Sequence, residues 1–373
     1  MYNIRKEINL KYVVIFREGI YDMRTSIRKI ISISCAAMMC IAALSGCVGN
    51  NSTEPSPEVE NTNITNTYAF VGKDIQNPYM QTVYEGFETA CRETGAQALY
   101  KSPEVTTPEK QIEIIESLIE QKVSGIAVAA NDADALSPVL QKAMNDGIKI
   151  ISFDSAVNKD ARQTHIQQAD PEKIGRELIR AAYEIVGGNG GIAILTSTDQ
   201  ATNQNLWLDY MNKEISENPE KYANTPVVSV AYGDDDFTKS TTETKGLLAN
   251  DDVKVIIAPT SVGMLAAAQV LEEEESDVKL TGLGMPSQMA PYIENGISPM
   301  VFLWNIVDIG YLAGYTMDAL ADGTITGAVG DSFNAGTLGG RTISVDSDGG
   351  SEVMLGDLLK FDSTNIAQWK DVY

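Results

Sequence analysis

Residues 108–130, PEKQIEIIESLIEQKVSGIAVAA, contain a predicted helix followed directly by a predicted strand. Ile112, Ile115 and Ile119 recur at the three- and four-residue spacing of a helix with one apolar face. The run GIAVAA at 125–130 is apolar throughout, which is typical of a strand covered on both faces. A helix leading into such a strand predicts an α/β fold with a parallel sheet.

The same alternation of apolar runs and amphipathic segments extends from Thr67 over the rest of the 373-residue chain. About nine strands are too many for a single open sheet in a chain of this length, and 373 residues are enough for two domains. We therefore predict two doubly wound parallel-sheet lobes joined by a hinge. The predicted strands are 67–73, 96–102, 125–130, 149–155, 191–198, 226–233, 253–260, 278–285 and 299–305.

The composition excludes two classes of partner. The formal net charge is −23, whereas nucleic-acid binding requires a basic surface to meet the phosphates. An anionic lipid surface likewise attracts Lys and Arg clusters rather than an acidic domain. A hydrophobic content of 43% is enough for substantial cores.

The N-terminal residues 1–46 are predicted to be a signal peptide whose true start is Met23. Basic residues precede the apolar stretch 30–43, which is too short for a comfortable membrane span. The stretch ends in LSGC at 44–47, which resembles the lipobox of bacterial lipoproteins, so we expect lipidation of Cys47. An ordinary secretory signal is the alternative. The protein is thus expected to be exported, anchored to the cell membrane and facing away from the cytoplasm.

The polar segment 47–66 reads as a flexible tether between the lipid and the first strand. Cleavage and lipidation would leave Cys91 as the single free thiol, so no internal disulfide is expected. We expect a monomer that rests on its hydrophobic cores.

Polar residues follow the ends of several predicted strands. In doubly wound sheets, ligands bind beyond the carboxyl ends of the strands. The segment ATNQNLW at 201–207 places three amides there, and each amide offers both a donor and an acceptor. Such groups suit a ligand rich in hydroxyls better than they suit catalysis.

Several kinds of chemistry find no support in the sequence. His165 is the only histidine, and one imidazole does not make a histidine-based metal site. No GxGxxG and no P-loop follow a strand, and the adjacent residues 234–236, all Asp, lack the alternating spacing of a calcium loop. We therefore expect no cofactor, no metal and no enzymatic activity, although a secreted α/β hydrolase or dehydrogenase is the rival from another class.

The lipobox, the two α/β lobes and the polar strand ends together resemble the sugar-binding proteins of ABC importers, which have the type I periplasmic-binding fold. NPYM at 77–80 is similar to the segment that contacts sugar in ribose-type binders, and FDS at 153–155 is similar to the end of their fourth strand. The resemblance covers 67–373. It implies capture of a sugar in a cleft between the lobes and delivery to an ABC permease. A sensory module with the same fold is the alternative, whereas a LacI-type repressor would need an N-terminal helix-turn-helix.

Two branches of this family are most similar to the chain, the rhamnose-binding proteins and the Lsr-type autoinducer-2 receptors. Of the ligand-binding residues of those receptors, four have a match in Lys73, Asp154, Gln204 and Pro259. Asn203 and Ser261 stand where the receptors have aspartate and alanine. We therefore favour rhamnose, with autoinducer-2 as the alternative.

The resemblance also implies lobe boundaries and a set of ligand-binding residues. The N-terminal lobe is expected to comprise 67–168 plus 306–340, and the C-terminal lobe 169–305 plus 341–373, with hinges near 168–170, 305–307 and 340–342. Amides and carboxylates would pair with hydroxyls, Tyr79 and Trp304 would cover the sugar ring, and Met80 or Met285 would meet a methyl group. Helix capping is the alternative for the Asn and Asp residues, and a core position is the alternative for Trp304. The predicted ligand-binding residues are Lys73, Asn77, Tyr79, Met80, Asn131, Asp154, Asn203, Gln204, Pro259, Ser261, Trp304 and Asn305.

Overall fold

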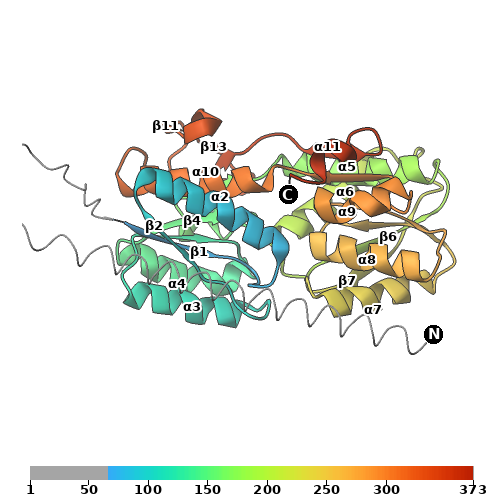
Figure 1. Ribbon diagram of the computed structural model, residues 1–373, viewed down its shortest axis with the longest axis horizontal. Helices are drawn as coiled ribbons and strands as arrows, with labels where there is room; N and C mark the ends of the chain where they lie inside the picture. Colours follow the sequence, from blue (N-terminus) through green and yellow to red (C-terminus); the bar gives the residue numbers. More distant parts are fainter. Residues whose placement is uncertain (1–65, 373) are drawn as a thin grey trace, which may run out of the picture. The chain divides into compact units, whose positions relative to one another are not determined.

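A seven-stranded sheet forms the N-terminal lobe in this computed structural model, which describes residues 66–372 (Figure 1). The strand order is β13-β14-β5-β4-β3-β1-β2, and all neighbours are parallel except β13 and β14. The predicted signal peptide, Cys47 and tether lie outside the described residues. The strands are β1 Thr67–Val71, β2 Gln97–Tyr100, β3 Gly125–Val128, β4 Lys149–Phe153, β5 Thr164–Gln167, β13 Ser344–Val345 and β14 Ser351–Met354.

Helices cover both faces of this sheet, as its apolar strands require. α2 (Pro78–Thr94) and α10 (Ile306–Ala321) lie on one face, and α3 (Pro108–Glu120) and α4 (Ala133–Asn145) lie on the other (Figure 1). Side chains of β1 alternate between the two resulting cores. Tyr68 and Phe70 join the cluster under α2 and α10, whereas Ala69 and Val71 join the cluster under α3 and α4.

A four-stranded parallel sheet with the order β7-β6-β8-β9 forms the C-terminal lobe. A parallel bridge from Leu283 to Phe302 places the antiparallel pair β10-β15 beside β9. The strands are β6 Gly191–Thr196, β7 Val227–Tyr232, β8 Val253–Ala258, β9 Lys279–Gly282, β10 Met300–Leu303 and β15 Leu359–Asp362. The helices are α5 Pro171–Ile185, α6 Thr202–Glu217, α7 Phe237–Leu248, α8 Ser261–Glu273, α9 Pro286–Glu294 and the short α11 Ile366–Trp369.

All nine predicted strands are present, and the predicted fold class is confirmed. Strand β5 was not predicted, and neither were the short strands near the C-terminus, which include β11 (Ser332–Asn334) and β12 (Gly340–Thr342). None of the helices between residues 66 and 372 is long and apolar enough to cross a membrane.

The chain passes between the two sheets after β5, after β10 and after β14. The first two passages agree with the hinges expected near 168–170 and 305–307. The third does not lie near 340–342, because β14 pairs with β5 and keeps the chain in the first sheet as far as Met354. Residues 341–354 therefore belong with the N-terminal sheet rather than with the C-terminal lobe.

Helices α2 and α10 approach each other through glycines (Figure 1). A Cβ atom on Gly86 would lie 1.9 Å from the Val307 carbonyl oxygen, and one on Gly310 would lie 1.7 Å from the Val83 carbonyl oxygen. Both obstacles are backbone atoms, which do not move aside as a side chain does. The close contact between these helices therefore depends on the absence of side chains at the two positions.

We expect Gly86→Ala to lower the free energy of unfolding by about 1–3 kcal/mol, because the added methyl group pushes α10 away from α2. Gly246→Ala in the exposed part of α7 is the matched control, since nothing lies within 4 Å of its added Cβ. The control should gain about 0.4–1 kcal/mol from the lower entropy of its unfolded chain. Urea unfolding measures both values, and equal effects would contradict the packing account.

Candidate ligand-binding site

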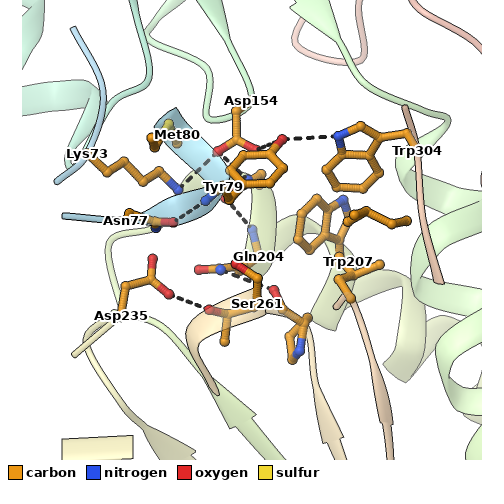
Figure 2. A pocket seen from close by; sticks show the side chains of 15 residues that line it. Lys73, Asn77, Tyr79, Met80, Asp154, Gln204, Trp207, Asp235, Ser261 and Trp304 are labelled. Carbon is orange, nitrogen blue, oxygen red and sulfur yellow. Dashed lines mark hydrogen bonds and ion pairs between the residues drawn. The ribbon is translucent and has the colours of Figure 1, made fainter. Parts of the chain in front are cut away.

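A pocket lies between the carboxyl ends of the strands of the two lobes (Figure 2). Its cavity volume is about 40 Å³, well below the range of small-ligand sites, so the pocket is closed in this form of the protein. Ten of the twelve predicted ligand-binding residues line it, and only Asn131 and Asn305 do not. Five further residues line it that were not predicted, namely Trp207, Asp235, Thr260, Leu283 and Leu303.

Asp154 lies at the centre of the polar contacts in this pocket (Figure 2). Its side chain is buried, and it accepts hydrogen bonds from the Tyr79 hydroxyl at 3.1 Å and from the Asn203 amide at 3.2 Å. The Lys73 ammonium lies 3.3 Å from its Oδ2 atom. Asp154 directly follows β4 and has a φ of +57°, a left-handed conformation that is uncommon outside glycine and costs free energy. The backbone thus turns sharply where the carboxylate enters the pocket.

Burial raises the pKa of the Asp154 carboxyl above its usual value, while Lys73 and Tyr79 oppose this effect. The pKa of the Tyr79 hydroxyl lies well above its usual value. Burial is the larger cause, and the nearby negative charge of Asp154 is the second. Tyr79 therefore keeps its proton and remains the donor to Asp154. Lys73 supplies the positive charge that makes a buried carboxylate tolerable.

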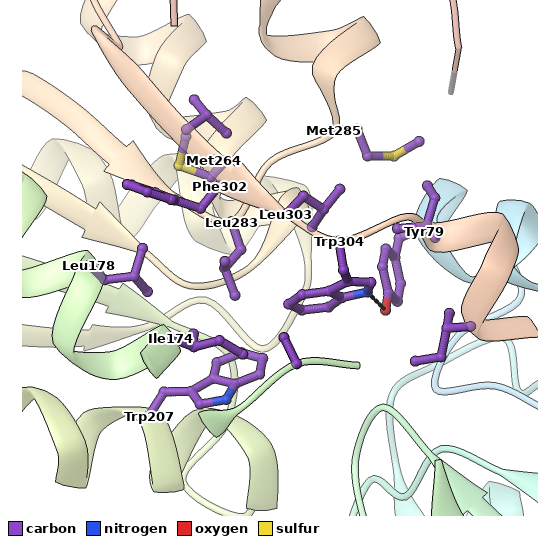
Figure 3. Close-up of a cluster of buried hydrophobic side chains, with 14 of the residues drawn as sticks. Tyr79, Ile174, Leu178, Trp207, Met264, Leu283, Met285, Phe302, Leu303 and Trp304 are labelled. Atoms are coloured by element: carbon purple, nitrogen blue, oxygen red, sulfur yellow. Dashed lines mark hydrogen bonds between the residues drawn. The ribbon is translucent and has the colours of Figure 1, made fainter. Parts of the chain in front are cut away.

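Three aromatic rings form one side of the pocket (Figure 3). The Trp304 indole donates to the Tyr79 hydroxyl at 3.0 Å, and the two rings meet edge to face at 6.2 Å between centroids. The Trp207 ring lies 6.1 Å from the Trp304 ring. Trp304 is 2% exposed, so both interpretations of it hold in part: it belongs to the core and it lines the pocket.

The first turn of α6 carries the amides of the ATNQNLW segment, which is helical from Thr202 onward. Asn203, Gln204 and Trp207 share the buried face of that helix. The Gln204 amide donates to the Pro259 carbonyl at 3.1 Å, but its Oε1 atom is buried without a hydrogen-bond partner among the described residues. Such an unpaired acceptor costs about 1–3 kcal/mol, which a ligand hydroxyl in the pocket would recover.

Asp235 and Thr260 form part of the pocket wall in the C-terminal lobe. The Thr260 hydroxyl donates to Asp235, and the Ser197 hydroxyl donates to the other carboxylate oxygen at 3.0 Å. Asp236, the next residue, accepts from the Lys239 amide as the N-cap of α7. The acidic run at 234–236 thus supplies a helix cap in Asp236 and one carboxylate, Asp235, that lines the pocket.

Asn131 and Asn305 do not line the pocket, and their side chains bond to the backbone instead. The Asn131 amide donates to the Lys73 carbonyl at 3.1 Å, so it holds the loop that presents Lys73. The Asn305 side chain accepts from the Val307 and Asp308 amides as the N-cap of α10. Both residues satisfy backbone groups, as Asn commonly does at the ends of strands and helices.

No cluster of residues between 66 and 372 has the geometry of a metal site. His165 is buried, its Nδ1 atom lies 2.9 Å from the Ser152 hydroxyl, and burial lowers its pKa to about 3. Its imidazole is thus neutral at ordinary pH, and it does not line the pocket.

A family model described as a periplasmic binding protein domain matches residues 68–325. The chain belongs to the periplasmic binding protein family. An ABC transporter solute-binding protein from Clostridium phytofermentas, solved with bound L-rhamnose, is 42% identical over 83% of this chain and 99% of that chain, with a TM-score of 0.80. A sugar ABC transporter protein from Actinomyces odontolyticus is 35% identical over 82% and 97%, with a TM-score of 0.64.

The LsrB protein from Clostridium saccharobutylicum in complex with AI-2 is 22% identical over 81% of this chain and 99% of that chain, with a TM-score of 0.76. At that identity, the likeness shows a shared fold alone. The prediction that this chain is a binding protein of the type I periplasmic-binding fold is confirmed. The roles of the pocket residues in ligand binding stay predictions.

We expect Lys73→Met to lower the free energy of unfolding by about 3–5 kcal/mol at neutral pH, because it leaves the buried Asp154 carboxylate without its cation. The change raises the pKa of Asp154 further in the folded state than in the unfolded state. The loss should therefore be present at neutral pH and shrink as the pH falls below that raised pKa. Urea unfolding at several pH values measures it.

Lys110→Met is the matched control, since Lys110 forms an exposed pair with Glu113. The control should change the free energy of unfolding by less than about 1 kcal/mol. A loss at Lys73 that is equally small, or that does not change with pH, would contradict the account of a buried ion pair.

Proposed function

We propose that this protein is the solute-binding component of a sugar ABC importer and that its ligand is L-rhamnose. The observation that carries the proposal is the pocket itself, where buried carboxylate, ammonium and amide groups converge beside aromatic rings. A relative that is 42% identical holds L-rhamnose, and it aligns with this chain over nearly its whole length.

Hydrogen bonding explains how such a pocket selects a sugar. A sugar that leaves water loses a hydrogen bond at every hydroxyl, and the site must replace each one. Asp154 and Gln204 supply acceptors, and Lys73 and Asn203 supply donors. The unpaired Oε1 atom of Gln204 is the group that gains most, because the closed pocket offers it no partner among the described residues.

Apolar side chains in the pocket wall account for the preference for a 6-deoxy sugar. Met80, Leu283 and Leu303 line the pocket and are nearly fully buried. They offer a methyl group a dry surface, whereas a hydroxyl at the same place would lose its hydrogen bonds to water. L-Mannose, which carries that hydroxyl, should therefore bind more weakly than L-rhamnose.

Lobe closure couples binding to transport. The bonds from Trp304 to Tyr79 and from Asn203 to Asp154 each join one lobe to the other. A ligand shifts the equilibrium towards the closed form only by its preference for that form, and a sugar touching both lobes has that preference. The closed, loaded form would then dock on the permease, with the lipid on Cys47 holding the protein at the membrane surface.

Calorimetric titration with L-rhamnose tests the proposal. We expect wild-type protein to bind it and Gln204→Met to bind it roughly ten- to a hundredfold more weakly, since the hydroxyl loses its acceptor. Asn305→Ala is the control, because Asn305 caps α10 outside the pocket. It should keep the affinity and lose about 1 kcal/mol of stability.

Autoinducer-2 and L-mannose complete the titration series. If the folded wild-type protein does not bind L-rhamnose, the assignment of L-rhamnose as its ligand is wrong. Binding of autoinducer-2 alone would assign the pocket to that signal, with Asn203 and Ser261 as tolerated differences from the receptors.

A further inference from the structure

A second cavity lies beside the ligand-binding pocket, and the two share three lining residues. Asp154, Asn203 and Trp207 line both spaces. The second cavity, which we call the side groove, has a volume of about 600 Å³ and opens to solvent. Its size exceeds what one more sugar unit requires.

The boundary between the two spaces depends on the position of the lobes. Asn203 on α6 donates to Asp154 after β4 at 3.2 Å, and these residues belong to different lobes. Opening the lobes breaks this bond, so a ligand longer than one ring can enter across the boundary. Closure around such a ligand replaces the bond with contacts to the ligand.

Uncharged polar and aromatic side chains give the side groove the chemistry of a sugar site. Asn158, Gln167, Asn205 and Tyr210 line it. The indole nitrogen of Trp207 is buried without a hydrogen-bond partner among the described residues, as Oε1 of Gln204 is in the pocket. A donor in this position is suited to an oxygen of a glycoside that spans the boundary.

The charges around the side groove exclude an anionic unit. The carboxylates of Asp209, Asp346 and Asp348 line it, and no Lys or Arg of the described residues 66–372 does. Arg162 pairs with Asp346 at 2.6 Å and with Asp348 at 2.9 Å, so one positive charge faces three carboxylates and the balance stays negative. His165 also lines it, but burial lowers its pKa to about 3, so it carries no positive charge at ordinary pH. A uronic acid would therefore meet repulsion, whereas a neutral sugar would not.

We propose that the protein binds glycosides of L-rhamnose, with the rhamnosyl ring in the pocket and a neutral second sugar unit in the side groove. This inference rests on the proposed function. It widens the ligand class from a monosaccharide to short neutral oligosaccharides. Tyr210 contacts only the second unit, since it lines the side groove and not the pocket.

Calorimetric titration with α-linked dirhamnose and with L-rhamnose tests the inference. Wild-type protein should bind both, and Tyr210→Ala should weaken dirhamnose binding about tenfold while leaving L-rhamnose binding unchanged. Tyr232→Ala is the matched control, because Tyr232 is a partly exposed tyrosine that lines neither cavity. It should change neither affinity.

Ser347→Trp provides a second, independent variant. Ser347 is exposed and lines the side groove, so a bulky ring there fills the groove without disturbing a core. It should abolish dirhamnose binding and retain L-rhamnose binding.

The outcomes separate the inference from the proposed function. Binding of L-rhamnose without dirhamnose by the wild-type protein would overturn the inference alone, and so would equal effects of Tyr210→Ala on both sugars. Failure of both sugars to bind would overturn the proposed function itself. A disaccharide of rhamnose with a uronic acid should bind at least tenfold more weakly than dirhamnose, and equal binding would contradict the charge argument.

Discussion

The burial of the Asp154 carboxylate is the constraint on which the pocket depends. A charge removed from water is costly unless donors and a cation surround it. Here the donors come from both lobes, since Tyr79 and Lys73 belong to the N-terminal lobe and Asn203 to the C-terminal lobe. The same carboxylate that we propose binds the ligand therefore also bonds the two lobes to each other.

This arrangement predicts that a ligand stabilises the closed form. The closed pocket leaves Oε1 of Gln204 unpaired and keeps Asp154 in a left-handed backbone conformation. Both features cost free energy, and contacts with a hydroxyl-rich ligand recover part of it. The three chain passages between the sheets permit the motion, since each is a short connection between a strand and the next element.

Most of the fold could be predicted from the sequence because the nine predicted strands are apolar runs separated by amphipathic helices. The strand β5, THIQ, escaped prediction because it is four residues long and mixes polar with apolar side chains. Its neighbours in the sheet bury even the polar ones, such as His165. Strand β14 also mixes polar with apolar side chains, and it was not predicted for the same reason. The third hinge was therefore placed too early in the chain. The pairing of β14 with β5 that keeps this segment in the first sheet is a contact between distant parts of the sequence.

The pocket could be predicted in part because parallel sheets gather ligands at the ends of their strands. That rule identifies a region but does not separate a side chain that lines the pocket from one that bonds to the backbone. Asn131 and Asn305 follow strands in this region, yet their side chains bond to backbone groups outside the pocket. Trp207 could have been found, since it lies three and four residues after Gln204 and Asn203 on one helical face. Asp235 could not have been found, because the direction in which its side chain points depends on the turn that joins β7 to α7.

The most direct test of the account is a crystal structure of the protein grown with L-rhamnose. We predict one sugar ring between the lobes, with hydroxyls bonded to Asp154 and to Oε1 of Gln204 and its methyl group against Met80, Leu283 or Leu303. A sugar bound elsewhere, or in the pocket without a bond to either polar side chain, would contradict the account.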